Sequence, residues 1–276
     1  MTVVRIPTRR AGGGASQALR DGLIVAWRNL KRVPRIPELA IFAILQSIMF
    51  VLLFAYVFGG AIPLPGGGSY IEYLMPGIFA QTIVFAAATT AISMTSDLSK
   101  GIIDRFRSLP MARSAVVSGR ALADVVYNAG ILVVLMLSGL AVGWRVHSSI
   151  PDFLAGVGLL LVFAFAMVWI GVWLGLSVPT VEVTQQLSFT VLFPLTFLSN
   201  VFVPTSTLPS WLKPIAEWNP VSALTAATRQ LWGNPNPFAA TGLPAEHPIA
   251  LTLIWAVVVV AIFAPLAAWR YHRMSR

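Results

Sequence analysis

Long apolar runs separated by short polar stretches are the main pattern along this chain of 276 residues. A run of about 20 apolar residues is long enough to cross a hydrocarbon core of roughly 30 Å as a helix. Six runs meet that length and are predicted to span a membrane, at 39–58, 73–92, 121–142, 153–178, 187–203 and 249–269. Pro194 lies inside the fifth run and is expected to kink it. The pattern predicts an all-α polytopic membrane domain over residues 38–269.

Composition supports a membrane protein. Charged residues make up 11% of the chain and apolar residues 57%, whereas a soluble domain carries about 25% charged residues. The chain contains no cysteine, which excludes a disulfide framework, Cys-ligated metals and a thiol nucleophile.

The basic residues divide unevenly between the two sides of the predicted spans. If the N-terminus is cytoplasmic, 16 of the 19 Lys and Arg residues lie on the cytoplasmic side, and only Arg145, Lys213 and Arg229 lie on the other. Because basic loops remain in the cytoplasm, both termini are predicted there, as a leader of residues 1–37 and a tail of residues 270–276. The leader is interpreted as retained, since the first run starts too late for a cleaved signal. The net charge of +9 then reflects topology and not nucleic-acid binding.

Two segments outside the spans have helical patterns. In residues 16–33, Leu19, Leu23 and Trp27 share one face, which predicts an amphipathic helix at the inner membrane interface; the alternative is a basic segment that only marks the membrane boundary. Between the fifth and sixth spans, Asn219 followed by Pro220 is a helix-start signature. Short helices that reach the outer leaflet are predicted there.

The segment SKGIIDRFRSLPMAR at 99–113 places charged residues between the second and third spans. Ile102, Phe106 and Leu109 recur at spacings of four and three, and Pro110 ends the turn. A short amphipathic helix here would let a soluble partner move both neighbouring spans. A basic loop that only fixes topology is the alternative, and the pattern alone does not decide between them.

Polar stripes run along the second and fifth predicted spans. Their members are Thr82, Thr89 and Ser93 on the second span, and Gln186, Thr190, Phe193, Phe197 and Asn200 on the fifth. Hydroxyl, amide and phenyl groups without charge suit a path for an amphiphilic molecule. Alternatively, the stripes are ordinary helix-packing surfaces, as is Gly171-x-x-x-Gly175 in the fourth span.

Several kinds of chemistry lack their sequence motifs. No G-x-x-x-x-G-K-[ST] phosphate-binding motif occurs, and none of the three histidines has a spacing suited to a metal or a catalytic dyad. The middle of every predicted span lacks a charge, whereas ion-coupled carriers keep ionisable residues there. An ion-coupled multidrug or lipid carrier is therefore less favoured and is kept as the alternative function. Glu246 beside His247 is the only weak candidate for a membrane enzyme that acts on lipids.

The stretch GIIDRFRSLPMARSAVVSGRALAD at 101–124 resembles the signature loop of type-2 ABC transporter permeases, specifically bacterial drug exporters of the daunorubicin/doxorubicin-resistance type. The resemblance extends to residues 38–62, 70–82 and 193–233. By position, the residues that match the loop motif are Gly101, Asp104, Arg105, Arg107, Leu109, Pro110 and Arg113.

This resemblance implies six spans, an N-terminal interfacial helix, and a coupling helix between spans two and three that docks on a separate ATP-binding subunit. It also implies a second permease subunit, expected to be a copy of this chain, and short external helices that close the exit. ATP and Mg²⁺ would bind the partner, and this chain would bind no cofactor or metal. The expected cargo is a hydrophobic small molecule or a lipid, exported across the bacterial cytoplasmic membrane.

Overall fold

The computed structural model describes residues 37–58, 69–102, 113–202, 208–236 and 242–273, and all regular structure within these ranges is helical. The all-α prediction is confirmed for this part of the chain, while the predicted helix at 16–33 lies outside it. The helices are α2 (Pro37–Leu53), continued by the π-helical turn η2 (Phe54–Phe58), α3 (Tyr70–Ser99), α5 (Arg113–Ala141), α6 (Ile150–Ser177), α7 (Val181–Phe197), α8 (Lys213–Glu217), α9 (Pro220–Trp232), α10 (Leu243–Glu246) and α11 (Pro248–Arg273).

Four helices are long and apolar enough to cross a membrane, over Tyr70–Ser99, Gly119–Ala141, Ile150–Ser177 and Pro248–Tyr271. They correspond to the second, third, fourth and sixth predicted spans. Helices α2 and α7, of 17 residues each, are not among these four. The first and fifth spans therefore remain predictions.

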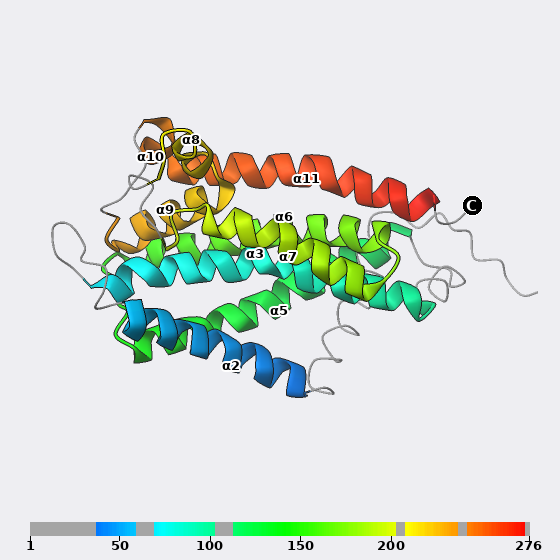
Figure 1. Cartoon of the computed structure of the whole chain (residues 1–276), viewed down its shortest axis with the longest axis horizontal. Coiled ribbons are helices and arrows are strands. Elements are labelled where there is room, and N and C mark those ends of the chain that lie inside the picture. The colour runs from blue at the N-terminus through cyan, green and yellow to red at the C-terminus, as the bar shows by residue number, and fades with distance from the viewer. Residues whose placement is uncertain (1–36, 59–68, 103–112, 203–207, 237–241, 274–276) are drawn as a thin grey trace, which may run out of the picture.

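Helix α3 forms the centre of the bundle (Figure 1). In its most apolar 18-residue stretch 72% of the residues are buried, against 17% in α11. Helix α6 packs closely on it through glycine, because a Cβ atom at Gly171 would lie 2.4 Å from the Ala87 carbonyl oxygen and one at Gly175 would lie 2.6 Å from that of Ala91. The Gly-x-x-x-Gly pattern is thus a packing surface.

The bundle has two distinct ends. Helix α3 ends and α5 begins at one of them, which we call the loop end, and the short helices α8, α9 and α10 lie at the opposite end, which we call the α9 end (Figure 1). Helix α9 starts where the sequence predicts, since the Asn219 side chain accepts a hydrogen bond from the Val221 amide and Pro220 fills the first position. Gly233, with φ at +66°, ends it in a conformation that suits glycine.

The helix expected for the fifth span starts and ends earlier in the chain than predicted. It was placed at 187–203, whereas α7 runs from Val181 to Phe197. Thr180 caps the helix by accepting a hydrogen bond from the Val183 amide at 3.3 Å. The first turns of α7 are polar, so they lie outside the apolar run. Thr184 in these turns is nevertheless buried.

Candidate functional site

The predicted docking segment at 99–113 begins at the end of α3. The Gly101 amide donates to the Leu98 carbonyl at 3.0 Å, and its φ of +65° ends the helix in a conformation favoured by glycine. Ile102 is half-buried, and Arg113 is the first residue of α5. The remaining motif residues, Asp104, Arg105, Phe106, Arg107, Leu109 and Pro110, lie outside the described residues. The coupling helix itself therefore stays a prediction.

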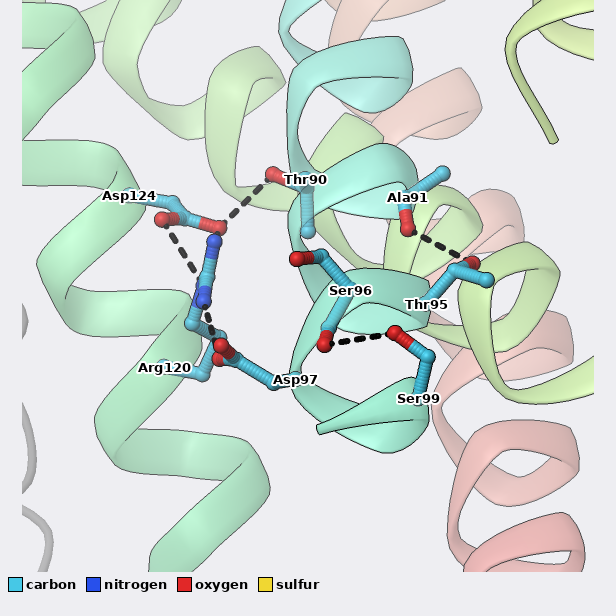
Figure 2. A network of polar contacts seen from close by, with 8 residues as sticks. All are labelled: Thr90, Ala91, Thr95, Ser96, Asp97, Ser99, Arg120 and Asp124. Atoms are coloured by element: carbon cyan, nitrogen blue, oxygen red, sulfur yellow. Dashed lines mark hydrogen bonds and ion pairs between the residues drawn. The ribbon is translucent and has the colours of Figure 1, made fainter. Parts of the chain in front are cut away.

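Directly beside this segment, a buried ion-pair network joins α3 to α5 (Figure 2). Arg120 of α5 donates from Nη1 to Asp97 of α3 at 3.1 Å, and its Nε lies 3.0 Å from both carboxylate oxygens of Asp124. The Thr90 hydroxyl donates to Asp124 at 2.7 Å and adds a second link between the helices. Arg120 therefore lies between two carboxylates and connects the two helices that flank the docking segment.

The network is buried enough to hold α3 and α5 together. Arg120 is 8% exposed and Asp97 is 6% exposed, and removing one partner of a buried ion pair costs about 3–5 kcal/mol. Sequence reasoning did not identify this network. The available signal was the spacing of four between Arg120 and Asp124, which places both on one helix face.

A second polar contact joins three helices near the loop end. The hydroxyl groups of Thr95 in α3 and Thr184 in α7 lie 2.9 Å apart, and the Thr95 hydroxyl also donates to the Gly175 carbonyl of α6 at 3.1 Å. Thr184 belongs to a buried stripe of α7 that also contains Ser188, Leu192 and Thr196. Helix α7 is thus attached to the bundle by a narrow and largely polar stripe.

The polar stripes predicted for substrate contact lie on two helices that pack against each other, α3 and α7. On α3, Thr89 is exposed, while Thr82 and Ser93 are partly exposed. On α7, Gln186 and Thr190 are exposed, and Phe193 stacks on Phe197 with ring centroids 4.3 Å apart. These are the members of the prediction that the structure leaves accessible on the surface of a single chain.

Asn200 does not belong to this exposed stripe, and its place in the cargo path stays a prediction. Helix α7 ends at Phe197, so the helical spacing that linked Asn200 to the stripe does not continue to it. Asn200 is 2% exposed, its amide donates to Ser222 of α9 at 3.0 Å, and its carbonyl accepts from the Tyr73 hydroxyl at 2.9 Å. It forms part of the connection between the end of α7 and its neighbours.

Comparison with known proteins places this architecture in a family. A family model for the ABC-2 type transporter matches residues 22–231. The daunorubicin resistance ABC transporter permease protein DrrB1 of Streptomyces coeruleorubidus is 32% identical over 249 residues, which cover 90% of this chain and 85% of that protein. The probable doxorubicin resistance ABC transporter permease protein DrrC of Mycobacterium tuberculosis is 23% identical over 271 residues, covering 98% and 95% of the two chains.

A further relative is the inner membrane transport permease YadH of Escherichia coli, 23% identical over 237 residues that cover 84% of this chain and 86% of YadH. The matched region contains the docking segment, the ion-pair network and both stripes. The chain belongs to the ABC-2 type transporter family.

Proposed function

We propose that this chain is the membrane-spanning permease subunit of an ABC exporter in the bacterial cytoplasmic membrane. The family match over residues 22–231, which includes the whole docking segment, carries the proposal. ATP and Mg²⁺ would be bound by a separate ATP-binding subunit, because this chain has no phosphate-binding motif of its own. Six spans, with both termini in the cytoplasm, would place the loop end on the cytoplasmic side.

The mechanism that we propose starts at the docking segment. Movement of the ATP-binding subunit would push on residues 99–113, and the Asp97–Arg120–Asp124 network would make α3 and α5 respond together. Helix α7 is held by its narrow buried stripe and would shift relative to them. Cargo would contact the exposed hydroxyl and phenyl groups of α3 and α7, which favours a hydrophobic or amphiphilic compound such as a drug or a lipid. Two permease subunits, expected to be identical, would enclose the path.

Charge reversal in the docking segment tests this proposal. The double variant Arg105→Glu/Arg107→Glu places like charges against a surface that has to accept two cations, which costs several kcal/mol and lowers affinity for the ATP-binding subunit by at least about tenfold. We expect the variant to insert in the membrane but to lose co-purification with that subunit and ATP-driven uptake into inside-out vesicles. Arg145→Glu is the matched control, because Arg145 is exposed and lies at the other end of α5. Normal transport by the double variant would contradict docking at this segment.

An ion-coupled carrier is the second candidate, because the structure shows buried and partly buried ionisable residues in α3 and α5. Asp97, Arg120 and Asp124 are paired with one another near the loop end, an arrangement that favours a structural link over ion binding. An uncoupler that abolishes transport at constant ATP would favour the carrier. Transport that survives the uncoupler and stops on ATP depletion would favour the ABC exporter.

A further inference from the structure

A fully buried arginine lies at the α9 end of the bundle. Arg229, in the last turn of α9, is 0% exposed. Its Nε donates to the Tyr73 carbonyl of α3 at 2.9 Å, and its guanidinium carbon lies 3.7 Å from the centre of the Tyr73 ring. Its two terminal nitrogens donate to the carbonyls of Asn200 and Val201, just beyond α7, at 3.2–3.4 Å, and one also reaches Asn236 at 3.4 Å.

The charge of Arg229 is balanced by dipoles. Within the part of the chain that the structure describes, no carboxylate pairs with it, whereas Arg120 at the loop end lies between two. Backbone carbonyl groups carry partial negative charge, and here the acceptors are the carbonyls of Tyr73, Asn200 and Val201. Burial lowers the pKa of the Arg229 guanidinium, yet an arginine side chain stays charged in proteins. A charge held in this way gains hydration as soon as water reaches it.

Arg229 connects a firmly packed element to a weakly attached one. Helix α9 is anchored in the core by Trp232. The centre of its ring lies 5.3 Å from that of Trp144 and 5.7 Å from that of Phe79, and its Nε1 donates to the Phe153 carbonyl. Helix α7, in contrast, buries one narrow stripe. Beyond α7, Val201 and Phe202 are buried in the hydrophobic core. The polar contacts that join the end of α7 to α9 are ones that water could replace: Arg229 donates to the Asn200 carbonyl, Ser222 accepts from the Asn200 backbone amide, and the Asn219 side chain donates to the Leu195 carbonyl.

We propose that Arg229 is a positioning residue that latches the end of α7 to α9 and keeps this end of the bundle closed. The latch rests on the proposed function, because that function places the α9 end outside the cell, where cargo would leave. When α7 shifts, the guanidinium releases the carbonyls of Asn200 and Val201 and becomes hydrated. The latch thus couples movement of α7 to entry of water at the exit.

Thr225 provides a reporter for this opening. It lies one turn before Arg229 in α9, between Ser222 and Arg229 in the sequence. Its side chain is 0% exposed, and its hydroxyl has no hydrogen-bond partner. Thr225→Cys therefore removes no hydrogen bond, and the chain contains no other cysteine. Labelling by a membrane-impermeant maleimide then measures access of water to the latch. Ile150→Cys, at a 76% exposed position at the same end, shows from which side the reagent reaches it.

The first test needs no ATP and no partner subunit. Arg229→Gln removes the charge and most of the donors. We expect Thr225→Cys to react with the maleimide at least about tenfold faster in this background than with Arg229 present. The reason is that a hydrogen bond from a charged group stabilises the closed state by about tenfold or more. Arg229→Lys keeps the charge but loses the forked geometry, so an intermediate rate is expected. Ser188→Cys, buried at 2% exposure in the α7 stripe, should remain unreactive in every background.

Two results would overturn the latch. One is an unchanged labelling rate of Thr225→Cys in Arg229→Gln; the other is a parallel increase at Ser188→Cys, which would mean that the bundle had loosened as a whole. With the ATP-binding subunit present, ATP hydrolysis should also accelerate labelling of Thr225→Cys in the Arg229 protein, and no acceleration in vesicles that transport cargo would contradict the proposal. Vesicles that neither hydrolyse ATP nor transport would refute the proposed function instead, and the ATP-free comparison would still decide the latch.

Discussion

At the scale of single residues, the close approach of the α3 backbone shows that two glycines of α6 pack helices together. The sequence left open whether small and polar residues at spacings of four line a path or pack helices. Gly171 and Gly175 face the α3 backbone, with room for hydrogen atoms only. Close approach of this kind replaces side-chain burial as the source of helix association in lipid.

Adding one methyl group at this contact should destabilise the protein. In Gly171→Ala the new Cβ would lie 2.4 Å from the Ala87 carbonyl oxygen, a backbone atom that cannot move aside alone. We expect a loss of about 1–3 kcal/mol, the usual cost of overpacking a core, measured as a lower thermal unfolding midpoint in detergent. Gly158→Ala on the same helix is the control, because no atom lies within 4 Å of its added Cβ and alanine favours a helix by up to about 1 kcal/mol. Equal midpoints for the two variants would contradict the close packing.

The ion-pair network shows what residue patterns reveal and what they omit. The spacing of Arg120 and Asp124 on one helix is readable from the sequence, but Asp97 lies 23 positions before Arg120 on another helix. That pairing depends on how far α3 continues beyond its apolar run and on the angle at which α5 returns. The predicted second span ends at 92, whereas the helix continues to Ser99, so Asp97 lay beyond the span.

At the scale of elements, the helices were predictable where apolar character is continuous. The predicted spans at 153–178 and 249–269 differ from α6 and α11 by at most four residues at either end. Helix α7 was misplaced because its buried stripe contains Thr184, Ser188 and Thr196, so polarity did not mark solvent exposure. Asn200 was included in the exposed stripe for a related reason, since the helical register was extended past the end of α7 at Phe197.

The narrow attachment of α7 predicts that this helix moves relative to α3 during transport. Because the hydroxyls of Thr95 and Thr184 are 2.9 Å apart, cysteines at both positions lie within reach of a disulfide. We expect the Thr95→Cys/Thr184→Cys protein to lose ATP-driven transport on oxidation and to regain it on reduction, with assembly unchanged. Each single variant under the same oxidant is the control. A fully oxidised double variant that still transports would show that the two helices move together.

At the scale of the whole molecule, helices α7 and α11 present exposed surfaces of different chemistry. Helix α7 exposes Val191 at 57% and Phe193 at 52%, beside the exposed Thr190. Helix α11 exposes aliphatic residues such as Val257, at 66%, which suits contact with lipid. The mixture of hydroxyl and phenyl groups on α7 supports the proposal that this helix meets a second permease subunit and cargo.

If two copies of the chain meet along α7, residues near the symmetry axis must face their own counterparts, because a two-fold interface is isologous. We expect Thr190→Cys proteins carrying two different epitope tags to be joined by a short thiol crosslinker in native membranes, so that each tag retrieves the other. Val257→Cys should not be joined, although it is more exposed, since α11 would face lipid. Crosslinking at Val257→Cys, with none at Thr190→Cys in membranes that transport, would place the subunit interface on α11 and move the cargo path away from the α3 and α7 stripes.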